Sequence, residues 1–354
     1  MKRIAKIILL NLTVLAVGIA IMEVVWRVSY ANDIRFSVNV LADTQYNTDV
    51  STLYNADNNI ISYSRDKYGF RGEYSQIEDI DIIAIGGSTT DQRHIDDKKE
   101  WTYILANSPV LQGLDITLVN AGVDGQSSFG HIKNFDLWFS KIDSLQPKYI
   151  LFYIGLNDFY NNANNPYDDL GQVKTIKAVI KGSFSFYIYR LIKGIILTKA
   201  HGIGHKAINY QSMKTTTTPL LEEGGYEPLM RTGLDAYLGR LNILVEKTRE
   251  LGATPVFITQ RTMKHWEENN QVIGIDEKYS YRDTEHNGVD NHYMEKLLND
   301  TTMSICKDRS DSICINLASD IYFEQNDFYD FAHNTPSGAA KIGNYLASKI
   351  KSFY

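Results

Sequence analysis

A serine, a histidine and an aspartate in this sequence have the residue types and contexts that nucleophilic acyl transfer requires. Ser88 stands in Gly86-Gly87-Ser88-Thr89-Thr90, directly after an apolar run, and Asp330-Phe331-Ala332-His333 lies near the carboxyl terminus. A hydroxyl is a weak nucleophile until an imidazole takes its proton, and the imidazole needs a carboxylate to fix its tautomer. Ser88, His333 and Asp330 supply these groups, which predicts a hydrolase.

The spacing of Asp330 and His333 favours contact between their side chains. Two side chains three residues apart can project from one side of a single turn. The carboxylate of Asp330 can then reach the imidazole nitrogen that faces away from Ser88. The local sequence therefore predicts a histidine that is held ready to accept a proton.

The elements that must position these residues follow from the apolar pattern. Short apolar runs of strand length alternate with amphipathic segments of helix length. This alternation predicts an α/β fold, a three-layer sandwich around a five-stranded parallel flavodoxin-like sheet. Ligands bind in such folds beyond the carboxyl ends of the strands, where Ser88, Gly125 and Asn157 fall. The predicted strands are Ile80 to Ile85, Ile116 to Asn120, Tyr149 to Ile154, Thr254 to Thr259 and Ser312 to Leu317, and the clearest helices are Met230 to Leu251, His292 to Lys307 and Gly338 to Phe353.

Four blocks of sequence occur in a specific order. They are Gly87-Ser88-Thr89, Asn120-Ala121-Gly122-Val123-Asp124-Gly125, Gly155-Leu156-Asn157-Asp158 and Asp330-Phe331-Ala332-His333. Their order and identities resemble the SGNH, or GDSL-type, hydrolase superfamily, from about Ile80 to the carboxyl terminus. The resemblance implies that Ser88 is the nucleophile and that His333, oriented by Asp330, is the base. It also implies an oxyanion hole made by the backbone N–H groups of Ser88 and Gly125 and the side-chain amide of Asn157.

Gly87 departs from the usual first block of that superfamily, in which an aspartate commonly precedes the serine. The departure leaves the nucleophile intact, because the serine does the chemistry. The form Gly-Gly-Ser-Thr-Thr resembles the variant in membrane-anchored members that are linked to cell-surface polysaccharides.

Each of these residues also has a structural explanation. Ser88 can cap a helix that follows a strand, Gly125 can serve a tight turn, and Asn157 can cap a helix or loop. Asp158 is expected to be such a cap rather than a catalyst. An α/β-hydrolase nucleophile elbow is disfavoured, since it needs a glycine where Thr90 stands. We favour the catalytic interpretation because four blocks agree, and we expect no cofactor and no metal ion.

The amino-terminal segment predicts a membrane anchor. Ile7 to Trp26 is apolar apart from Asn11, Thr13 and Glu23, and a helix of that length spans roughly 30 Å, the thickness of a bilayer core. Basic residues precede the run and mixed charges follow it, so the positive-inside rule places the amino terminus in the cytoplasm. The alternatives are a signal peptide cleaved after Ser29-Tyr30-Ala31 and a buried core helix.

The chain is expected to be a single-pass membrane protein with an extracytoplasmic catalytic domain, periplasmic or at the cell surface. Residues 1–30 are the predicted anchor or signal peptide, and 31–78 are polar and irregular, a stalk and lead-in. Residues 79–354 form the predicted SGNH hydrolase domain, with an insertion at about 160–225. Within the insertion, Phe184 to Thr198 predicts a helix that packs over the core, a substrate lid or a membrane-surface contact.

Charge and cysteine content narrow the range of partners. The 354 residues carry a formal net charge of -6 without a basic run, which argues against a nucleic-acid partner. Cys306 and Cys314 are the only cysteines. On an extracytoplasmic domain they can form a disulfide, or they can be two unpaired small residues, and the sequence leaves both alternatives open.

The sequence thus predicts an extracytoplasmic serine esterase that acts through an acyl-serine intermediate. Its expected substrate is an acylated carbohydrate, such as an acetylated surface glycan, or a small ester. A glycan O-acyltransferase with the same triad is the first alternative. A non-catalytic glycan-assembly scaffold that keeps the hydrolase fold is the second.

Overall fold

The computed structural model describes residues 2–29, 34, 38–160, 183–189, 192 and 205–353. The chain divides into two compact units, which are described separately. One comprises residues 1–40 and 170–205, and the other comprises residues 41–169 and 206–354.

The second unit is built on a five-stranded parallel sheet in the order β12-β7-β5-β3-β4. Numbered along the chain, these five strands lie in the order 5-4-3-1-2, which is the flavodoxin-like arrangement. The predicted fold class is therefore confirmed. The strands are β3 (Ile80–Gly86), β4 (Thr117–Asn120), β5 (Tyr149–Tyr153), β7 (Thr254–Ile258) and β12 (Ile313–Ile315).

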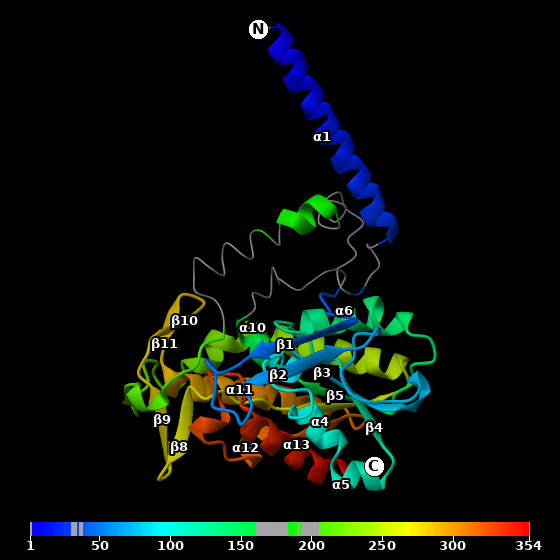
Figure 1. The fold of residues 1–354 in the computed structure, drawn as a ribbon. Helices are drawn as coiled ribbons and strands as arrows, with labels where there is room; N and C mark the ends of the chain where they lie inside the picture. Colours follow the sequence, from blue (N-terminus) through cyan, green and yellow to red (C-terminus); the bar gives the residue numbers. More distant parts are fainter. Residues whose placement is uncertain are drawn as a thin grey trace. The chain divides into compact units, whose positions relative to one another are not determined.

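Helices cover both faces of this sheet, which makes the three layers (Figure 1). Because both faces are covered, the centres of the strands are apolar, and Ile82 to Ile85 are fully buried. One face carries α4 (Trp101–Ala106), α5 (Pro109–Gly113) and α13 (Pro336–Ile350). The other carries α6 (Ser128–Leu137), α10 (Tyr226–Glu250) and α11 (Gly288–Asp308).

The lead-in segment differs from the expectation of an irregular stalk. It contains an antiparallel hairpin of β1 (Thr44–Asp49) and β2 (Ile60–Arg65). Alternate residues of β2, Ile61, Tyr63 and Arg65, are buried. This alternation of buried and exposed residues is that of a half-buried strand. It is hard to recognise in the sequence because Ser62 and Ser64 separate the buried residues and one of these is the charged Arg65. The hairpin belongs to the same compact unit as the sheet.

Small antiparallel sheets are formed by four strands that follow β7 in the chain and by β6, which precedes α10. Strands β6 (Thr215–Thr216), β8 (His265–Glu268) and β9 (Gln271–Ile275) form one of them. Strands β10 (Tyr279–Tyr281) and β11 (Thr284–His286) form the other.

The first unit contains α1 (Lys2–Ser29), the one helix in the described part of the chain that is long and apolar enough to cross a membrane. Its Lys6–Ser29 stretch has a mean hydropathy of 2.4. Near its end, Trp26 stacks on Tyr187 at 4.9 Å, and Glu23 accepts a hydrogen bond from the backbone of Phe184. Residues 184–189 are helical, as predicted, while most of the predicted insertion lies outside the described residues.

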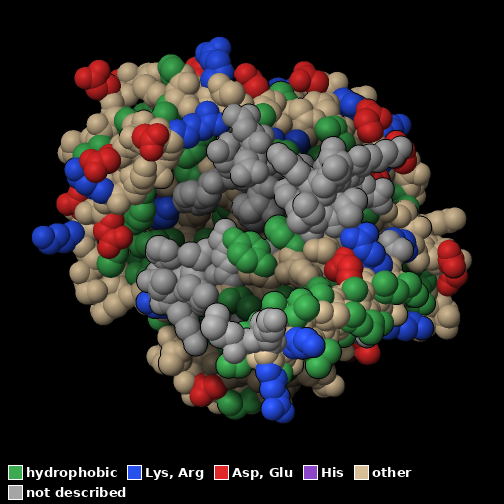
Figure 2. Space-filling model, turned by 90° about the horizontal axis from the view of Figure 1, so that it is seen from above, with side chains coloured by type: hydrophobic (Ala, Val, Ile, Leu, Met, Phe, Trp, Pro, Cys, Tyr) green, Lys and Arg blue, Asp and Glu red, His purple; other side chains and the backbone are tan. Residues whose placement is uncertain are grey.

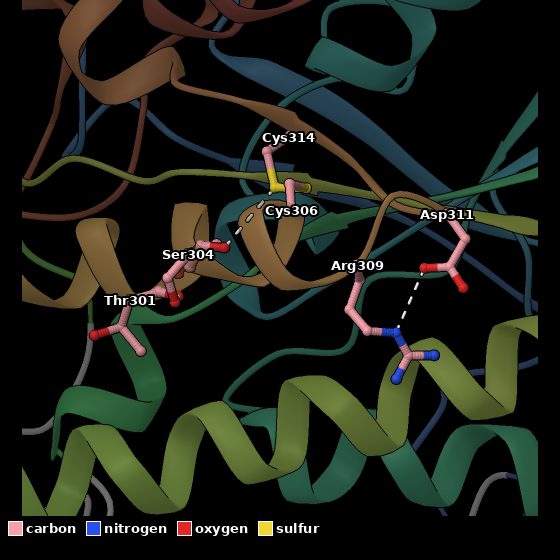
Figure 3. The surroundings of a disulfide bond; sticks show 7 residues. Thr301, Ser304, Cys306, Arg309, Asp311 and Cys314 are labelled. Carbon is pink, nitrogen blue, oxygen red and sulfur yellow. Dashed lines mark hydrogen bonds and ion pairs between the residues drawn. A yellow bond between two sulfur atoms is a disulfide. The ribbon is translucent and has the colours of Figure 1, made fainter.

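Cys306 and Cys314 form a disulfide between the last turn of α11 and strand β12 (Figure 3). Their Cα atoms are 6.1 Å apart. Arg309 and Asp311 pair with each other in the connecting turn. Of the two alternatives that the sequence leaves open, the structure therefore has the disulfide.

Charges of both signs are interspersed on the surface. On the face in Figure 2, Lys and Arg side chains lie among Asp and Glu side chains, and within its described portion neither sign forms a large patch. This distribution accords with a formal net charge of only -6 on 354 residues.

Candidate active site

Ser88 lies at the carboxyl end of β3, where the strand turns into a one-turn helix, α3 (Ser88–Asp91). Gly87 is the cap of this turn, and its carbonyl accepts the N–H groups of Thr90 and Asp91. The alternative in which Ser88 is itself the helix cap is therefore wrong. Gln92, in the left-handed conformation with φ 44°, ends the turn. The half-buried hydroxyl of Ser88 is left to face the edge of the sheet.

The imidazole of His333 connects Ser88 to Asp330. Its Nε2 atom lies 2.7 Å from the Ser88 hydroxyl, and its Nδ1 atom lies 2.8 Å from Oδ2 of Asp330. Since a carboxylate only accepts hydrogen bonds, this geometry assigns the proton to Nδ1 and leaves Nε2 as the acceptor. A hydroxyl held in this way can pass its proton to the imidazole.

Asp330 also shapes the turn that presents His333. Its Oδ1 atom accepts the backbone N–H groups of Ala332, at 2.9 Å, and of His333, at 2.7 Å. The predicted turn is thus closed by the aspartate side chain itself. The ring of Tyr329 stacks on the imidazole at 5.7 Å with an interplanar angle of 12°. These contacts fix both the position and the tilt of the imidazole.

Asn157 approaches Ser88 from the end of β5. Gly155, at φ +125°, lets the chain turn sharply into α7 (Leu156–Tyr160). The Asn157 Nδ2 atom donates to the carbonyl of Gln126 at 2.7 Å, which uses one of its two N–H bonds. The amide abuts Gly87 so closely that a Cβ atom there would lie 2.3 Å from Nδ2. This contact gives a physical reason for glycine before the serine.

Gly125 has the left-handed conformation that suits a glycine, with φ +74°. It directly precedes Gln126, which lines the same pocket as Ser88, although Gly125 itself is not part of that lining. The loop that contains Gly125 therefore reaches the pocket through Gln126. The structural explanation of Gly125, a turn, therefore holds, while Asn157 lies inside α7 and donates to the carbonyl of Gln126.

The pocket beside Ser88 is small, with a volume of about 90 Å³. It reaches from the Ser88 turn to the His333 turn and is walled by residues that follow β5 and β7. Its lining consists of Gly87, Ser88, Thr89, Gln126, His131, Ile154, Gly155, Leu156, Asn157, Gln260, Thr262, Lys264, Phe331, Ala332 and His333.

Gln260 is a site residue that the sequence does not reveal. It follows β7 and is 3% exposed. Its Nε2 atom donates to the Thr89 hydroxyl at 2.8 Å, and its Oε1 atom accepts the backbone N–H of Leu156 at 3.1 Å. One amide thus joins the neighbours of Ser88 and Asn157. The only available signal is its place at the carboxyl end of a predicted strand.

A second amide supports the Gly125 loop. The Gln126 side chain exchanges two hydrogen bonds of 2.9 Å with Asn134, and its Oε1 atom lies 3.1 Å from Nδ1 of His131. Burial lowers the pKa of His131 to about 3, so the ring stays neutral and Nδ1 can donate to Gln126. These contacts hold the carbonyl that receives Asn157.

Asp158 is structural, as the sequence predicts. It accepts the backbone N–H of Ser128 at 3.0 Å, at the start of α6, and pairs with buried Arg240 at 3.0 Å. Burial raises the pKa of Asp158, while Arg240 and Ser128 act in the opposite direction. The pair anchors α7, and with it Asn157, to helices α6 and α10.

Asp91 links the Ser88 turn to the hairpin. Its fully buried carboxylate accepts the Tyr63 hydroxyl at 2.8 Å, and it pairs with Arg65 at 2.7 Å and with Arg93 at 3.0 Å. Burial alone would raise the pKa of Asp91, but the guanidinium groups outweigh it and hold that pKa well below its usual range. The lead-in segment therefore contributes directly to the support of the site.

Comparison with known proteins identifies the domain that holds this site. Residues 82–346 match the family GDSL-like lipase/acylhydrolase. A solved structure of a member of the lipolytic protein G-D-S-L family from Veillonella parvula is 12% identical, covers 78% of this chain and 100% of its own, and gives a TM-score of 0.41. An acetylxylan esterase from Geobacillus stearothermophilus is 13% identical, covers 78% and 94%, and gives 0.41. No curated protein sequence matches the chain.

Proposed function

The chain belongs to the GDSL-like lipase/acylhydrolase family, whose members hydrolyse acyl esters, and from this premise we propose that Ser88 is its nucleophile and His333 its general base. Asp330 orients the base. The observation that carries the proposal is the unbroken series of hydrogen bonds from the Ser88 hydroxyl through His333 to Asp330, with distances of 2.7 and 2.8 Å. Such a series is what a serine hydroxyl needs to become a nucleophile at neutral pH.

The reaction proceeds in two steps. In the first, the Ser88 oxygen attacks the ester carbonyl while Nε2 of His333 takes the hydroxyl proton, and the alcohol then leaves with that proton as the acyl-serine forms. In the second, water gives its proton to His333 and attacks the acyl carbon. Ser88 regains the proton as the carboxylic acid departs. No other reactant is required.

An oxyanion hole opposite His333 stabilises the negative charge that develops on the ester oxygen. Its donors are the backbone N–H groups of Ser88 and Gly125 and the second N–H of Asn157. The contacts of Asn157 with Gln126 and Gly87 support this assignment, because they fix the amide close to Ser88 before any substrate binds. A donor fixed in this way contributes roughly 3 kcal/mol to transition-state stabilisation.

The proposed location is extracytoplasmic. Helix α1 anchors the protein with its amino terminus in the cytoplasm, and the catalytic domain follows it outside, at the surface or in the periplasm. The apolar length of α1 and the disulfide between Cys306 and Cys314 support this topology, because disulfides persist in oxidising compartments. The substrate proposed for such a location is an acylated surface glycan.

The test uses the full chain in detergent micelles. Wild-type protein is expected to hydrolyse nitrophenyl acetate and to be labelled by a fluorophosphonate, while Ser88→Ala abolishes both. Acetylated glycans then report on the substrate, and acetyl recovered on an added sugar acceptor identifies transfer rather than hydrolysis. Labelling or hydrolysis that survives in Ser88→Ala overturns the assignment of the nucleophile. A wild-type protein that is neither labelled nor active, and whose phenotype Ser88→Ala leaves unchanged, supports the non-catalytic role in glycan assembly instead.

A further inference from the structure

The hairpin in the lead-in segment has a small hydrophobic core of its own, and Tyr329 belongs to that core. The hairpin, residues 44–65, comprises β1, β2 and the loop that joins them. Its buried apolar residues pack together with Tyr329, which comes from the carboxyl-terminal part of the chain and is 5% exposed. The reaction proposed above gives this contact no role. The hairpin residues of the core are Val50, Leu53, Ile61 and Tyr63.

Tyr329 also belongs to the turn that carries the general base. Its backbone N–H donates to the carbonyl of His333 at 3.0 Å, and its own carbonyl accepts the N–H of Ile208 at 2.8 Å. The ring lies nearly parallel to the imidazole of His333, with an interplanar angle of 12° and 5.7 Å between the ring centres. A displacement of the Tyr329 ring would therefore shift or tilt the imidazole.

Tyr54 connects the hairpin loop to the Tyr329 ring. It lies between β1 and β2, and the centre of its ring is 5.9 Å from that of Tyr329. Its hydroxyl donates to the carbonyl of His94 at 2.6 Å, and the ring of His94 in turn contacts Tyr329 edge to face, with ring centres 6.4 Å apart. The Tyr329 ring is thus packed against Tyr54 and His94 as well as against the imidazole of His333.

The position of this imidazole matters, because the proposed proton transfer from Ser88 depends on one short contact. Nε2 of His333 lies 2.7 Å from the Ser88 hydroxyl, and a misplacement of about 1 Å can cost about 10² in rate. The imidazole becomes positively charged when it takes the proton, and an aromatic ring within about 6 Å attracts a cation. A stacked tyrosine can therefore position the base and stabilise its charged form.

We propose that the hairpin is part of the catalytic machinery, because it positions the general base through Tyr54 and Tyr329. Tyr329 is a positioning residue for His333, and Tyr54 acts through Tyr329. The proposal rests on the function proposed above, since it concerns the general base of that reaction. The segment that follows helix α1 in the chain is then needed for turnover, rather than serving only as a linker.

The first experiment removes the Tyr329 ring from the full-length enzyme, with nitrophenyl acetate as the substrate. Tyr329→Leu is expected to lower kcat by about 10- to 100-fold. KM should change little, because Tyr329 is not part of the pocket lining. Labelling by a fluorophosphonate requires an activated Ser88 and should slow by a similar factor. Tyr329→Phe keeps the ring and should restore most of the lost rate.

The second experiment tests whether Tyr54 acts through Tyr329. Tyr54→Leu should lower kcat by about three- to tenfold, since it removes the support of the Tyr329 ring without removing that ring. In the Tyr329→Leu background the same substitution should lower kcat little further. Losses that add in the double variant overturn the proposed path. If Tyr329→Leu does not fold, a normal kcat in Tyr54→Leu overturns the proposal instead.

Tyr293→Leu is the matched control. The ring of Tyr293 packs against that of Tyr226 at 5.1 Å, between helices α11 and α10, so the substitution removes a ring contact of the same kind elsewhere in the domain. Its kcat should equal that of the wild type. Thermal melts identify the variants that are folded at the assay temperature. A folded Tyr329→Leu enzyme that keeps its kcat, or that is impaired only in KM, overturns the proposal. Neither result affects the assignment of Ser88, which Ser88→Ala tests separately.

Discussion

Gly87 and Asn157 exclude any side chain between them, because a Cβ atom on Gly87 would lie 2.3 Å from the Nδ2 atom of Asn157. The same Cβ atom would lie 3.0 Å from the carbonyl of Gln126, which holds that amide. The aspartate common before the serine in related hydrolases therefore cannot be accommodated here without moving Asn157. Glycine before Ser88 and the position of the amide are thus parts of one arrangement.

Gly87→Ala is accordingly expected to displace the Asn157 amide from Ser88. The predicted result is a fall in kcat of about 10²–10³, comparable to that of Asn157→Ala and typical of the loss of one oxyanion donor. Kinetics with nitrophenyl acetate measure it. Gly239→Ala is the control, because Gly239 lies in helix α10 and a methyl group there meets only open space. A Gly87→Ala enzyme with nearly normal kcat shows that Asn157 does not assist the reaction.

Asp330→Asn separates the two roles of the aspartate. Asparagine keeps an oxygen for the N–H groups of Ala332 and His333, so the turn is expected to persist. The imidazole loses its carboxylate partner and its preferred tautomer, for which related triads lose about 10⁴ in kcat. Asp330→Ala should lose stability as well as activity. Activity assays and thermal melts of both variants distinguish these effects, and near-normal turnover of Asp330→Asn contradicts the proposed triad.

The sheet is predictable because burial on both faces leaves a direct trace in the sequence. Apart from Asp81 near the start of β3, strands β3 and β5 consist of apolar, aromatic and glycine residues, and their observed ends lie within one residue of the predicted ends. The proximity of Ser88 and His333 follows from the same pattern, since both lie where chain segments reach one edge of the sheet.

The rest of the site depends on contacts between distant residues that leave no local pattern. Strand β2 ends at Arg65, whose buried charge is balanced by Asp91, 26 positions later in the chain. In the segment Ser62-Tyr63-Ser64-Arg65-Asp66-Lys67, an arginine among polar and charged residues indicates a solvated loop until that partner is known. Gln260 is similar, because an amide that joins Thr89 to Leu156 has the same appearance in the sequence as any surface glutamine.

Gln260 is expected to act as a positioning residue for both halves of the site. Gln260→Met keeps the volume but removes both hydrogen bonds, and a displacement of about 1 Å costs up to about 10² in rate. We therefore expect kcat to fall by about 10- to 100-fold while KM changes little. Thr89→Ala removes only one of the two hydrogen bonds, so its kcat should fall less than that of Gln260→Met. Thr89→Ser should retain activity because its hydroxyl remains. If the losses in kcat of the two single variants add in the Gln260→Met, Thr89→Ala double variant, the two residues do not act through their shared hydrogen bond.

The disulfide is expected to stabilise the domain without affecting turnover. It closes a short loop between residues separated by 8 positions, for which loop-closure entropy predicts about 2–3 kcal/mol of unfolding free energy. The Cys306→Ser, Cys314→Ser variant should unfold at lower urea concentration and keep its kcat, since neither cysteine lines the pocket. Thiol titration of protein isolated from its membrane should find reactive thiols only after reduction. Free thiols in that sample contradict the proposed extracytoplasmic location.

Asp91 predicts a dependence of stability on pH. Its folded-state pKa is depressed, so its contribution is complete above the unfolded value of about 3.9 and declines as pH falls toward the folded value. Asp91→Asn should therefore lose about 3–5 kcal/mol of unfolding free energy at pH 7, where two arginines are left facing a neutral amide. Below pH 3.9 the difference from wild type should shrink by about 1.4 kcal/mol per pH unit. Urea unfolding at pH 7, 5 and 3.5 measures this trend. A constant difference at all three values shows that the charge of Asp91 does not contribute, and that the hairpin is held to the Ser88 turn by packing instead.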